Sequence, residues 1–191
     1  MKPGQFLRHY FRSPMKTVAV ATSSRQLAER IIGMADLSGA RMVIELGPGT
    51  GVFTERILAA LPPACEFFAL EINADFVAAT RRRCPGARVH HDTAARANHY
   101  LRALGRTGCD RIISGLPWAS FAASLQDELL GTIVEALEPG GLFLTFAYLQ
   151  GLLLPTGQRF RRKLSARFAS IQRSHTVWRN VPPAFVYCAR R

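Results

Sequence analysis

The chain has 191 residues, of which 48% are hydrophobic and 20% charged, with 15 Gly and 11 Pro. This length and composition exclude a disordered, collagen-like or low-complexity chain and predict one domain with a hydrophobic core. Lys and Arg outnumber Asp and Glu by 25 to 13, and the resulting charge of +12 favours a polyanionic partner, either nucleic acid or an anionic membrane.

The basic residues gather at the two ends of the chain. No acidic residue follows Glu138, whereas nine Lys and Arg residues do, and a second basic group lies in the first 30 residues. A generically basic proteome would explain the net charge, but it explains this uneven placement less well.

Several classes of protein are disfavoured by what the sequence lacks. The longest mostly apolar stretch, residues 142–154, is shorter than the roughly 20 residues that span a bilayer. The N-terminus has no clean apolar run, so it does not resemble a secretory signal. The four cysteines show no metal-ligand spacing. We therefore expect reduced thiols, no metal site and a cytoplasmic location.

Residues 1–22 form a basic and aromatic lead-in whose apolar residues suit one face of a helix, interrupted near Pro14. Ser23 and Gln26 have the spacing of a capping box, which predicts a helix to about Met34. We expect residues 1–22 to be a membrane-facing segment and residues 23–191 to be the folded domain, with an insertion at about residues 152–172.

Strand and helix patterns then alternate. The predicted strands are Arg41–Leu46, Glu66–Glu71, Arg88–His91, Arg111–Ser114 and Leu142–Ala147, and the predicted helices are Phe53–Leu61, Ala74–Arg83, Ala94–Leu104 and Leu125–Leu137. Such alternation implies crossover connections and a parallel sheet. Two further strands, His175–Arg179 and Phe185–Ala189, are predicted as an antiparallel pair at one edge. The predicted fold is a single doubly wound, Rossmann-like α/β domain with a mostly parallel seven-stranded sheet and an antiparallel C-terminal edge.

The loop after the first predicted strand reads Glu-Leu-Gly-Pro-Gly-Thr-Gly over residues 45–51. Glycines there let the backbone turn tightly and approach a ligand. Glu71, twenty residues after Gly51 at the end of the second strand, can accept both hydroxyls of a ribose. Nicotinamide dinucleotide binding is the competing interpretation. Glu45 disfavours it, because an acid there repels a pyrophosphate but can hold a cationic amino acid.

The string VIELGPGTGVFT, residues 43–54, resembles the first motif of class I S-adenosylmethionine-dependent methyltransferases. The resemblance implies that the loop packs on the methionine and ribose, that Glu71 binds the ribose, and that Asp92 reaches the adenine amine. A glycine-rich turn without function is the alternative. The predicted cofactor-binding residues are Glu45, Gly47, Pro48, Gly49, Thr50, Gly51, Glu71, Ile72, Asp92, Thr93 and Ser114.

A second motif, Ser-Gly-Leu-Pro-Trp at residues 114–118, ends the fourth predicted strand. It resembles the Asn-Leu-Pro-Tyr motif of the ribosomal RNA adenine dimethyltransferases, with Gly115 in place of Asn and Trp118 in place of Tyr. A planar exocyclic amine needs acceptors that fix its hydrogens, and glycine offers only backbone. An amine on an alkyl chain needs no such clamp, although it must arrive unprotonated.

Together with residues 22–24 (Thr-Ser-Ser) and residues 177–187 (VWRNVPPAFVY), this motif resembles the bacterial phospholipid N-methyltransferases, relatives of the adenine dimethyltransferases. The resemblance implies methylation of phosphatidylethanolamine, through mono- and dimethyl forms, toward phosphatidylcholine. It also implies that the N-terminal segment and the basic insertion lie on the inner face of the membrane as a peripheral attachment.

The predicted catalytic residues surround this motif. Leu116 and Pro117 are expected beside the amine, and Trp118, Phe121 and Tyr148 are expected to form an aromatic wall that receives the developing ammonium by cation–π contact. Tyr148 is also a candidate for removing a proton from the incoming ammonium. Plain core packing is the alternative for Trp118 and Phe121.

The insertion has the pattern of a basic amphipathic helix. Phe160, Leu164, Phe168 and Ile171 share one face. The residues predicted to contact the membrane or substrate from the other face are Arg159, Arg161, Arg162 and Lys163. An ordinary surface helix packed on the sheet and a groove for RNA phosphates are the alternatives.

Two other functions stay open on the sequence. One is an RNA adenine N6-methyltransferase, which we would expect to carry an added C-terminal helical domain. The other is a non-catalytic protein that binds the cofactor, which we would expect to have a broken glycine loop or no ribose-binding acid. The sequence does not indicate an oligomeric state.

Overall fold

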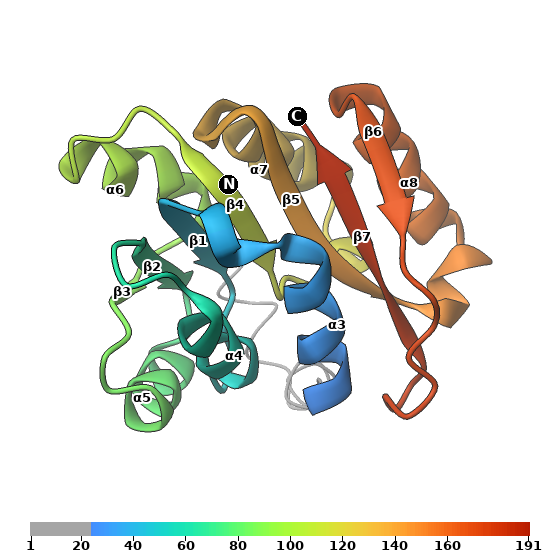
Figure 1. Ribbon diagram of the computed structural model, residues 1–191. Coiled ribbons are helices and arrows are strands. Elements are labelled where there is room, and N and C mark those ends of the chain that lie inside the picture. Colours follow the sequence, from blue (N-terminus) through green and yellow to red (C-terminus); the bar gives the residue numbers. More distant parts are fainter. Residues whose placement is uncertain (1–23) are drawn as a thin grey trace.

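The computed structural model describes residues 24–191, so the predicted N-terminal membrane-facing segment lies outside the described part. Seven strands form one sheet in the order β3-β2-β1-β4-β5-β7-β6 (Figure 1). The strands are β1 (Met42–Leu46), β2 (Glu66–Glu71), β3 (Val89–His91), β4 (Cys109–Ser114), β5 (Leu137–Tyr148), β6 (Ser170–Arg173) and β7 (Ala184–Arg190). The helices are α3 (Arg25–Ala35), α4 (Val52–Ala60), α5 (Ala74–Arg83), α6 (Ala97–Ala103), α7 (Ala123–Ala136) and α8 (Pro155–Arg167).

The five strands from β3 to β5 pair in parallel, whereas β7 pairs antiparallel with both β5 and β6. The predicted fold class is thereby confirmed. The strand order reverses between β1 and β4, and in sheets of this kind a ligand binds outside the carboxyl ends of the strands at that point. The glycine-rich loop follows β1 and the Ser-Gly-Leu-Pro-Trp motif follows β4, so the topology brings the two predicted motifs together.

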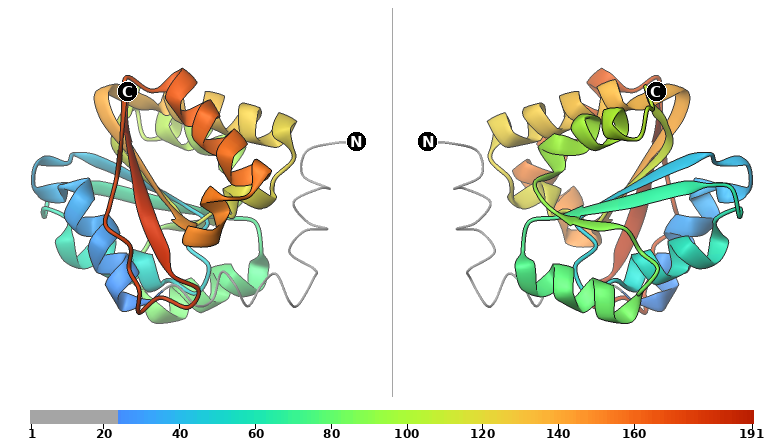
Figure 2. Two further views of the ribbon diagram at one scale, coloured as in Figure 1. Left: turned by 90° about the vertical axis from the view of Figure 1, so that its right-hand side faces the viewer. Right: turned by 90° about the vertical axis from the view of Figure 1, so that its left-hand side faces the viewer.

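Helices cover both faces of the sheet, with α3, α4 and α5 on one face and α6, α7 and α8 on the other (Figure 2). Successive residues of β1 alternate between the two cores. Ile44 and Leu46 pack with α6, α7 and α8, and Val43 packs with α3 and α4. A strand buried on both faces reads as a continuous apolar run, which is the pattern that predicted this strand.

The start of α3 differs from the prediction by one residue. Ser24, rather than Ser23, is the N-cap, and its Oγ accepts a hydrogen bond from the Leu27 amide at 3.1 Å. The Ser24 amide donates to Oδ1 of Asn180 at 2.9 Å, which ties this helix to the loop before β7. Within the predicted helix 94–104, Ala94–Arg96 form a 3₁₀ turn, and the α-helix begins at Ala97.

The predicted strand at His175–Arg179 is wrong. The edge strand is β6, Ser170–Arg173, and only Val177 of the predicted segment forms an isolated bridge, with Ala184. The physical reason is that β6 is an edge strand whose side chains are exposed apart from a half-buried Ile171, so it lacks the alternation that marks a half-buried strand.

The insertion forms the predicted helix, but its apolar face is not free. Phe160, Leu164 and Phe168 are buried in the core that covers the α6–α8 face of the sheet, and Ile171 belongs to β6. That face is therefore unavailable to a membrane, and the surface helix packed on the sheet is the alternative that fits it. Within residues 24–191, no helix has both the length and the apolar character needed to cross a membrane.

Candidate functional site

The loop after β1 depends on its glycines. Gly47, Gly49 and Gly51 have φ values of 73°, 60° and 82°, a left-handed conformation that other residues rarely adopt. A Cβ at Gly47 would lie 2.7 Å from Cδ2 of Leu116. The loop is therefore packed directly against the Ser-Gly-Leu-Pro-Trp motif, and a ligand held by the loop would also touch that motif.

Glu45 lies in β1 beneath this loop and is fully buried. Its Oε2 accepts a hydrogen bond from the Thr54 hydroxyl at 2.7 Å, whereas its Oε1 has no hydrogen-bond partner among residues 24–191. Burial raises the pKa of Glu45 to about 8. A buried carboxyl oxygen without a donor fits a cationic group, such as the ammonium of an amino acid.

Glu71, at the end of β2, is oriented by the backbone around it. Its Oε2 accepts from the Gly49 amide at 3.1 Å and its Oε1 accepts from the Asn73 amide at 2.9 Å. Burial raises the pKa of Glu71, and these amides oppose the rise. Each carboxylate oxygen can accept a further hydrogen bond, so the side chain fits two adjacent hydroxyl groups.

Asp92 lies just past the end of β3, next to Glu71. Its Oδ1 accepts from the Thr93 amide at 2.8 Å and its Oδ2 accepts from the Tyr100 hydroxyl at 3.1 Å. One recess at the carboxyl ends of the strands brings together five predicted residues. These are Gly47, Glu71, Ile72, Asp92 and Leu116. Pro48 and Thr50 lie in the same loop, while Thr93 caps the turn after Asp92.

Ser114 has a different place from the one predicted. It is fully buried, and its Oγ accepts from the Leu116 amide at 3.2 Å and from the Trp118 indole nitrogen at 3.1 Å. Both donors belong to the motif that follows, so the hydroxyl holds the motif in shape from behind. Ser114 is therefore a positioning residue in this structure, rather than a cofactor contact.

Gly115 is enclosed by backbone. A Cβ at this position would lie 2.4 Å from the carbonyl oxygen of Gly47, and the Gly115 amide donates to the Leu46 carbonyl at 2.8 Å. The position that carries Asn in the adenine dimethyltransferases thus has no room for a side chain in this conformation. The motif can offer a target nitrogen backbone groups and apolar or aromatic surfaces only.

An apolar cavity of about 340 Å³ opens beside the motif, on the side of the sheet covered by α8. The Leu116-Pro117-Trp118 segment forms one wall, Tyr148 lies at the end of β5, and Leu154 marks the outer side. The cavity therefore runs from the predicted catalytic residues to an exposed leucine.

The predicted aromatic wall is only partly present. Trp118 and Tyr148 line the cavity. Trp118 is also a core residue, stacked on Phe160 with 5.0 Å between ring centroids. Phe121 is buried, packs edge-on against Trp118 with 5.9 Å between ring centroids, and does not line the cavity. Its predicted contact with membrane or substrate is wrong, because η3 (Trp118–Ser120) turns it inward.

Four aromatic residues of the cavity wall were not among the predicted site residues. Phe146 comes from β5, Phe160 from α8, and Phe185 and Tyr187 from β7. The sequence predicts a membrane-facing side for Phe160, because helical periodicity shows that a face is apolar but not what covers it. Tyr148 pairs with Ala184, so β7 borders the site. This could have been predicted only if the register between β5 and β7 were known from the sequence.

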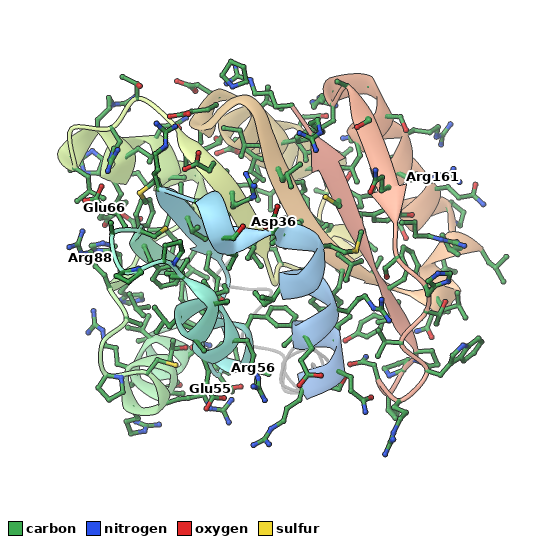
Figure 3. All side chains as sticks on the ribbon, in the orientation of Figure 1. Asp36, Glu55, Arg56, Glu66, Arg88 and Arg161 are labelled. Carbon is green, nitrogen blue, oxygen red and sulfur yellow. The ribbon has the colours of Figure 1, made fainter. Side chains whose placement is uncertain are left out.

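The basic residues of α8 fall into two groups. Arg159, Arg161 and Arg162 are exposed, and Arg161 lies at the outer edge of the molecule beside β6 (Figure 3). Lys163 instead donates to the Ala123 carbonyl at 2.6 Å and pairs with Asp127 at 2.8 Å. Lys163 is therefore held against α7, and its predicted membrane contact is not supported.

No family model matches the chain. Over 97% of its length it is 29% identical to an ornithine lipid N-methyltransferase of Singulisphaera acidiphila, 94% of which is covered. It is 33% identical to the ribosomal RNA small subunit methyltransferase A of Synechococcus sp. (strain CC9605), but that match covers 58% of this chain and 40% of the relative.

Solved structures show the same fold. The O-methyltransferase TomG from Streptomyces achromogenes, solved with S-adenosylmethionine, aligns with a TM-score of 0.71 over 100% of this chain and 99% of its own, at 15% identity. An O-methyltransferase from Bacillus cereus, solved with S-adenosylhomocysteine, aligns with a TM-score of 0.71 over 98% and 91%, at 13% identity. Among residues 24–191, no group of His, Cys, Asp and Glu could hold a metal ion.

The shared fold, the similarity over nearly the whole chain and the glycine loop with its two acids confirm the predicted resemblance. The chain has the fold of the class I S-adenosylmethionine-dependent methyltransferases and resembles them in sequence over nearly its whole length.

Proposed function

We propose that the chain transfers methyl groups from S-adenosylmethionine to the amine of a membrane aminolipid, with phosphatidylethanolamine and its mono- and dimethyl forms as substrates toward phosphatidylcholine. The observation that most strongly supports this proposal is the apolar cavity, which extends from Leu116 and Pro117 to the exposed Leu154. The full-length similarity to an ornithine lipid N-methyltransferase supports a lipid substrate and makes ornithine lipid the second candidate.

The cofactor would be held by groups already in place. Glu45 offers a buried carboxyl oxygen for the ammonium, Glu71 offers a backbone-oriented carboxylate for the ribose hydroxyls, and Asp92 lines the same recess as Glu71. When bound, S-adenosylmethionine supplies an electrophilic methyl group on a positively charged sulfur. The residues of this chain then have to deliver an unprotonated amine in line with that methyl group.

The cavity suits this task. Burial among apolar side chains disfavours a charged ammonium, so the lining favours the neutral, nucleophilic form of the amine. The Leu116 carbonyl accepts from the Trp118 amide at 2.9 Å and has a second lone pair for an amine hydrogen. The rings of Trp118 and Tyr148 provide faces for the charge that develops on nitrogen. Tyr148, as the phenolate, is the candidate acceptor for a proton of the incoming ammonium, and the transfer leaves a neutral phenol and a neutral amine.

We also propose that the chain is cytoplasmic and binds peripherally to the inner, anionic face of the membrane. Leu153 is 83% exposed and Leu154 is 50% exposed at the mouth of the cavity. The basic residues Arg159, Arg161 and Arg162 follow on α8. Apolar side chains and basic residues at one site are the combination by which proteins dock on anionic lipid.

A second exposed apolar pair lies at the same end of the sheet. Trp178 and Val181, in the loop before β7, are 69% and 76% exposed. The Leu149 amide donates to the Pro183 carbonyl at 2.8 Å, so the segments after β5 and before β7 leave the same end of the sheet. In Figure 1 the loop before β7 lies at the bottom of the molecule and the segment after β5 lies above it at the right-hand edge.

The test is a methyl-transfer assay with radiolabelled S-adenosylmethionine. Three acceptors are compared at equal protein concentration: vesicles of phosphatidylethanolamine with an anionic lipid, the same vesicles with ornithine lipid, and unmodified small-subunit ribosomal RNA. Label in a lipid amine supports the proposal, and the lipid that accepts it identifies the headgroup. Label in RNA and in neither lipid would replace the proposal with adenine methylation.

A further inference from the structure

A second hollow adjoins the cavity on the outer side of Tyr187. It has a volume of about 570 Å³ and lies between α8 and β6, with Arg161, Ser165 and Arg173 on its walls. Leu152 and Tyr187 line both this groove and the apolar cavity. A ligand whose amine occupies the cavity would therefore carry its next few atoms toward this groove.

Both arginines of the groove lie near aromatic residues of β7. The guanidinium of Arg173 lies 5.3 Å from the ring centroid of Phe185, which itself lines the apolar cavity. Burial raises the pKa of Tyr187, while the positive charges of Arg161 and Arg173 oppose that rise, so both cations act on the same phenol.

These arginines also lack the acidic partners that their neighbours have. Lys163 and Arg167 pair with Asp127 at 2.8 and 2.7 Å. Across residues 24–191, no carboxylate lies within ion-pair distance of Arg161 or Arg173. Two unpaired guanidinium groups, with the hydroxyls of Tyr187 and Ser165 beside them, form a set of donors suited to a phosphate or carboxylate.

We propose that this groove binds the anionic group of the aminolipid headgroup, a phosphodiester or a carboxylate, while the amine occupies the adjoining cavity. This inference rests on the proposed function and adds a basis for specificity. Arg161 and Arg173 would select amines that carry an anion a few bonds away over simple alkylamines. The exposed Arg159, which lies on the same helix but does not line the groove, would serve only the general attraction to lipid.

The test compares substrates that share an amine and an alkyl chain but differ in the anion. Phosphatidylethanolamine, ornithine lipid and hexadecylamine are each presented in neutral phosphatidylcholine vesicles, which removes electrostatic attraction to the surface. Arg161→Ala and Arg173→Ala should each raise KM about tenfold, the equivalent of about 1.4 kcal/mol, for the lipids whose anion the groove holds. KM for hexadecylamine and all kcat values should stay within twofold.

Controls separate the groove from folding and from docking. Arg102→Ala, at an exposed position of α6 that lines neither the groove nor the cavity, should leave the KM of every substrate unchanged. Arg161→Lys should fall between wild type and Arg161→Ala, because an ammonium keeps the charge but loses the fork of two donors. The melting temperature of each variant checks the fold. An equal rise of KM for hexadecylamine and the lipids, or no rise for any substrate, would overturn the groove as an anion site.

A binding measurement distinguishes failure of the groove from failure of the proposed function. Dihexanoylphosphatidylethanolamine is titrated into protein saturated with S-adenosylhomocysteine, and binding is followed by calorimetry. Binding that weakens about tenfold in Arg161→Ala, without methylation of any lipid, would support the groove and refute the proposed function. Methylation of phosphatidylethanolamine with unchanged binding in Arg161→Ala and Arg173→Ala would do the reverse.

Discussion

Replacing Gly115 by alanine would place a methyl group between the substrate motif and the glycine-rich loop. The new Cβ would lie 2.4 Å from the Gly47 carbonyl oxygen, whereas real Cβ contacts essentially never fall below 3.0 Å, so the two segments would have to separate by at least 0.6 Å. Both are held in place: the Gly115 amide donates to the Leu46 carbonyl at 2.8 Å and the Gly47 amide donates to the Leu70 carbonyl at 2.9 Å.

Forced separation of packed segments typically costs about 1–3 kcal/mol of unfolding free energy. We expect Gly115→Ala to lose stability in this range in urea denaturation, with weaker binding of S-adenosylmethionine by calorimetry because the loop itself is displaced. Gly131→Ala is the matched control. Gly131 lies on the exposed side of α7, and a Cβ added there would have no atom within 4 Å, so alanine should stabilise the helix by about 0.5–1 kcal/mol.

A Gly115→Ala protein with unchanged stability and cofactor affinity would refute the close packing of these two segments. It would also remove the steric reason for the missing amide side chain. In that case Gly115→Asn could restore the acceptor that an adenine amine requires, and nothing in the packing of the motif would then disfavour a planar substrate.

Three further predictions concern the cofactor and the membrane. Glu71→Ala should weaken S-adenosylmethionine binding at least about tenfold by calorimetry, because charged hydrogen bonds contribute about 1.5–3 kcal/mol each; unchanged affinity would remove the ribose role. Burial raises the pKa of Glu45 from 4.5 to about 8, so the stability that this residue contributes to the cofactor-free protein is complete below pH 4.5 and is lost as the pH rises through about 8. Denaturation at several pH values should show that decline in the wild type and a flatter profile in Glu45→Gln. Equal profiles would contradict the raised pKa of Glu45. The double variant Leu153→Ser, Leu154→Ser should sediment less with anionic vesicles without a lower melting temperature, because both side chains are exposed. Binding of the wild type to these vesicles should fall with added salt. Vesicle binding that changes neither with the double variant nor with salt would argue against this docking surface.

The parallel strands could be predicted from the sequence, and one strand and the helix after it could be predicted with their exact bounds, whereas β4 and β5 begin two and five residues earlier than predicted. Glu66–Glu71 and Ala74–Arg83 match the structure residue for residue. Strands that are buried on both faces leave a continuous apolar run, and Asn73 supplies the side chain that caps the next helix by accepting from the Asp75 and Phe76 amides. Local signals and tertiary burial agree in this part of the chain.

The C-terminal edge could not be predicted in the same way. Strand β6 has mostly exposed side chains, and what holds it is pairing with β7 over Ser170–Arg173, a non-local interaction without a local pattern. Val177 and Trp178 have high strand propensity, yet only Val177 forms a bridge. Propensity is a weak guide where edge position decides the outcome.

The candidate site was predictable where a motif fixes a residue and its place on a strand end. Glu45, Glu71 and Asp92 were identified on that basis, and the structure places them around the glycine loop. The cavity was not predictable, because its far wall comes from α8 and β7. The apolar face of α8 required a partner, and the sequence alone could not distinguish a membrane from the ring of Trp118.

The most direct measurement is a crystal structure of the protein with S-adenosylhomocysteine and a short-chain phosphatidylethanolamine. We predict that the lipid nitrogen lies beside Leu116 and Pro117 inside the apolar cavity, with the alkyl chains leaving past Leu154. A lipid bound elsewhere, with the cavity closed to its amine while the cofactor site is filled, would contradict the proposed lipid methylation.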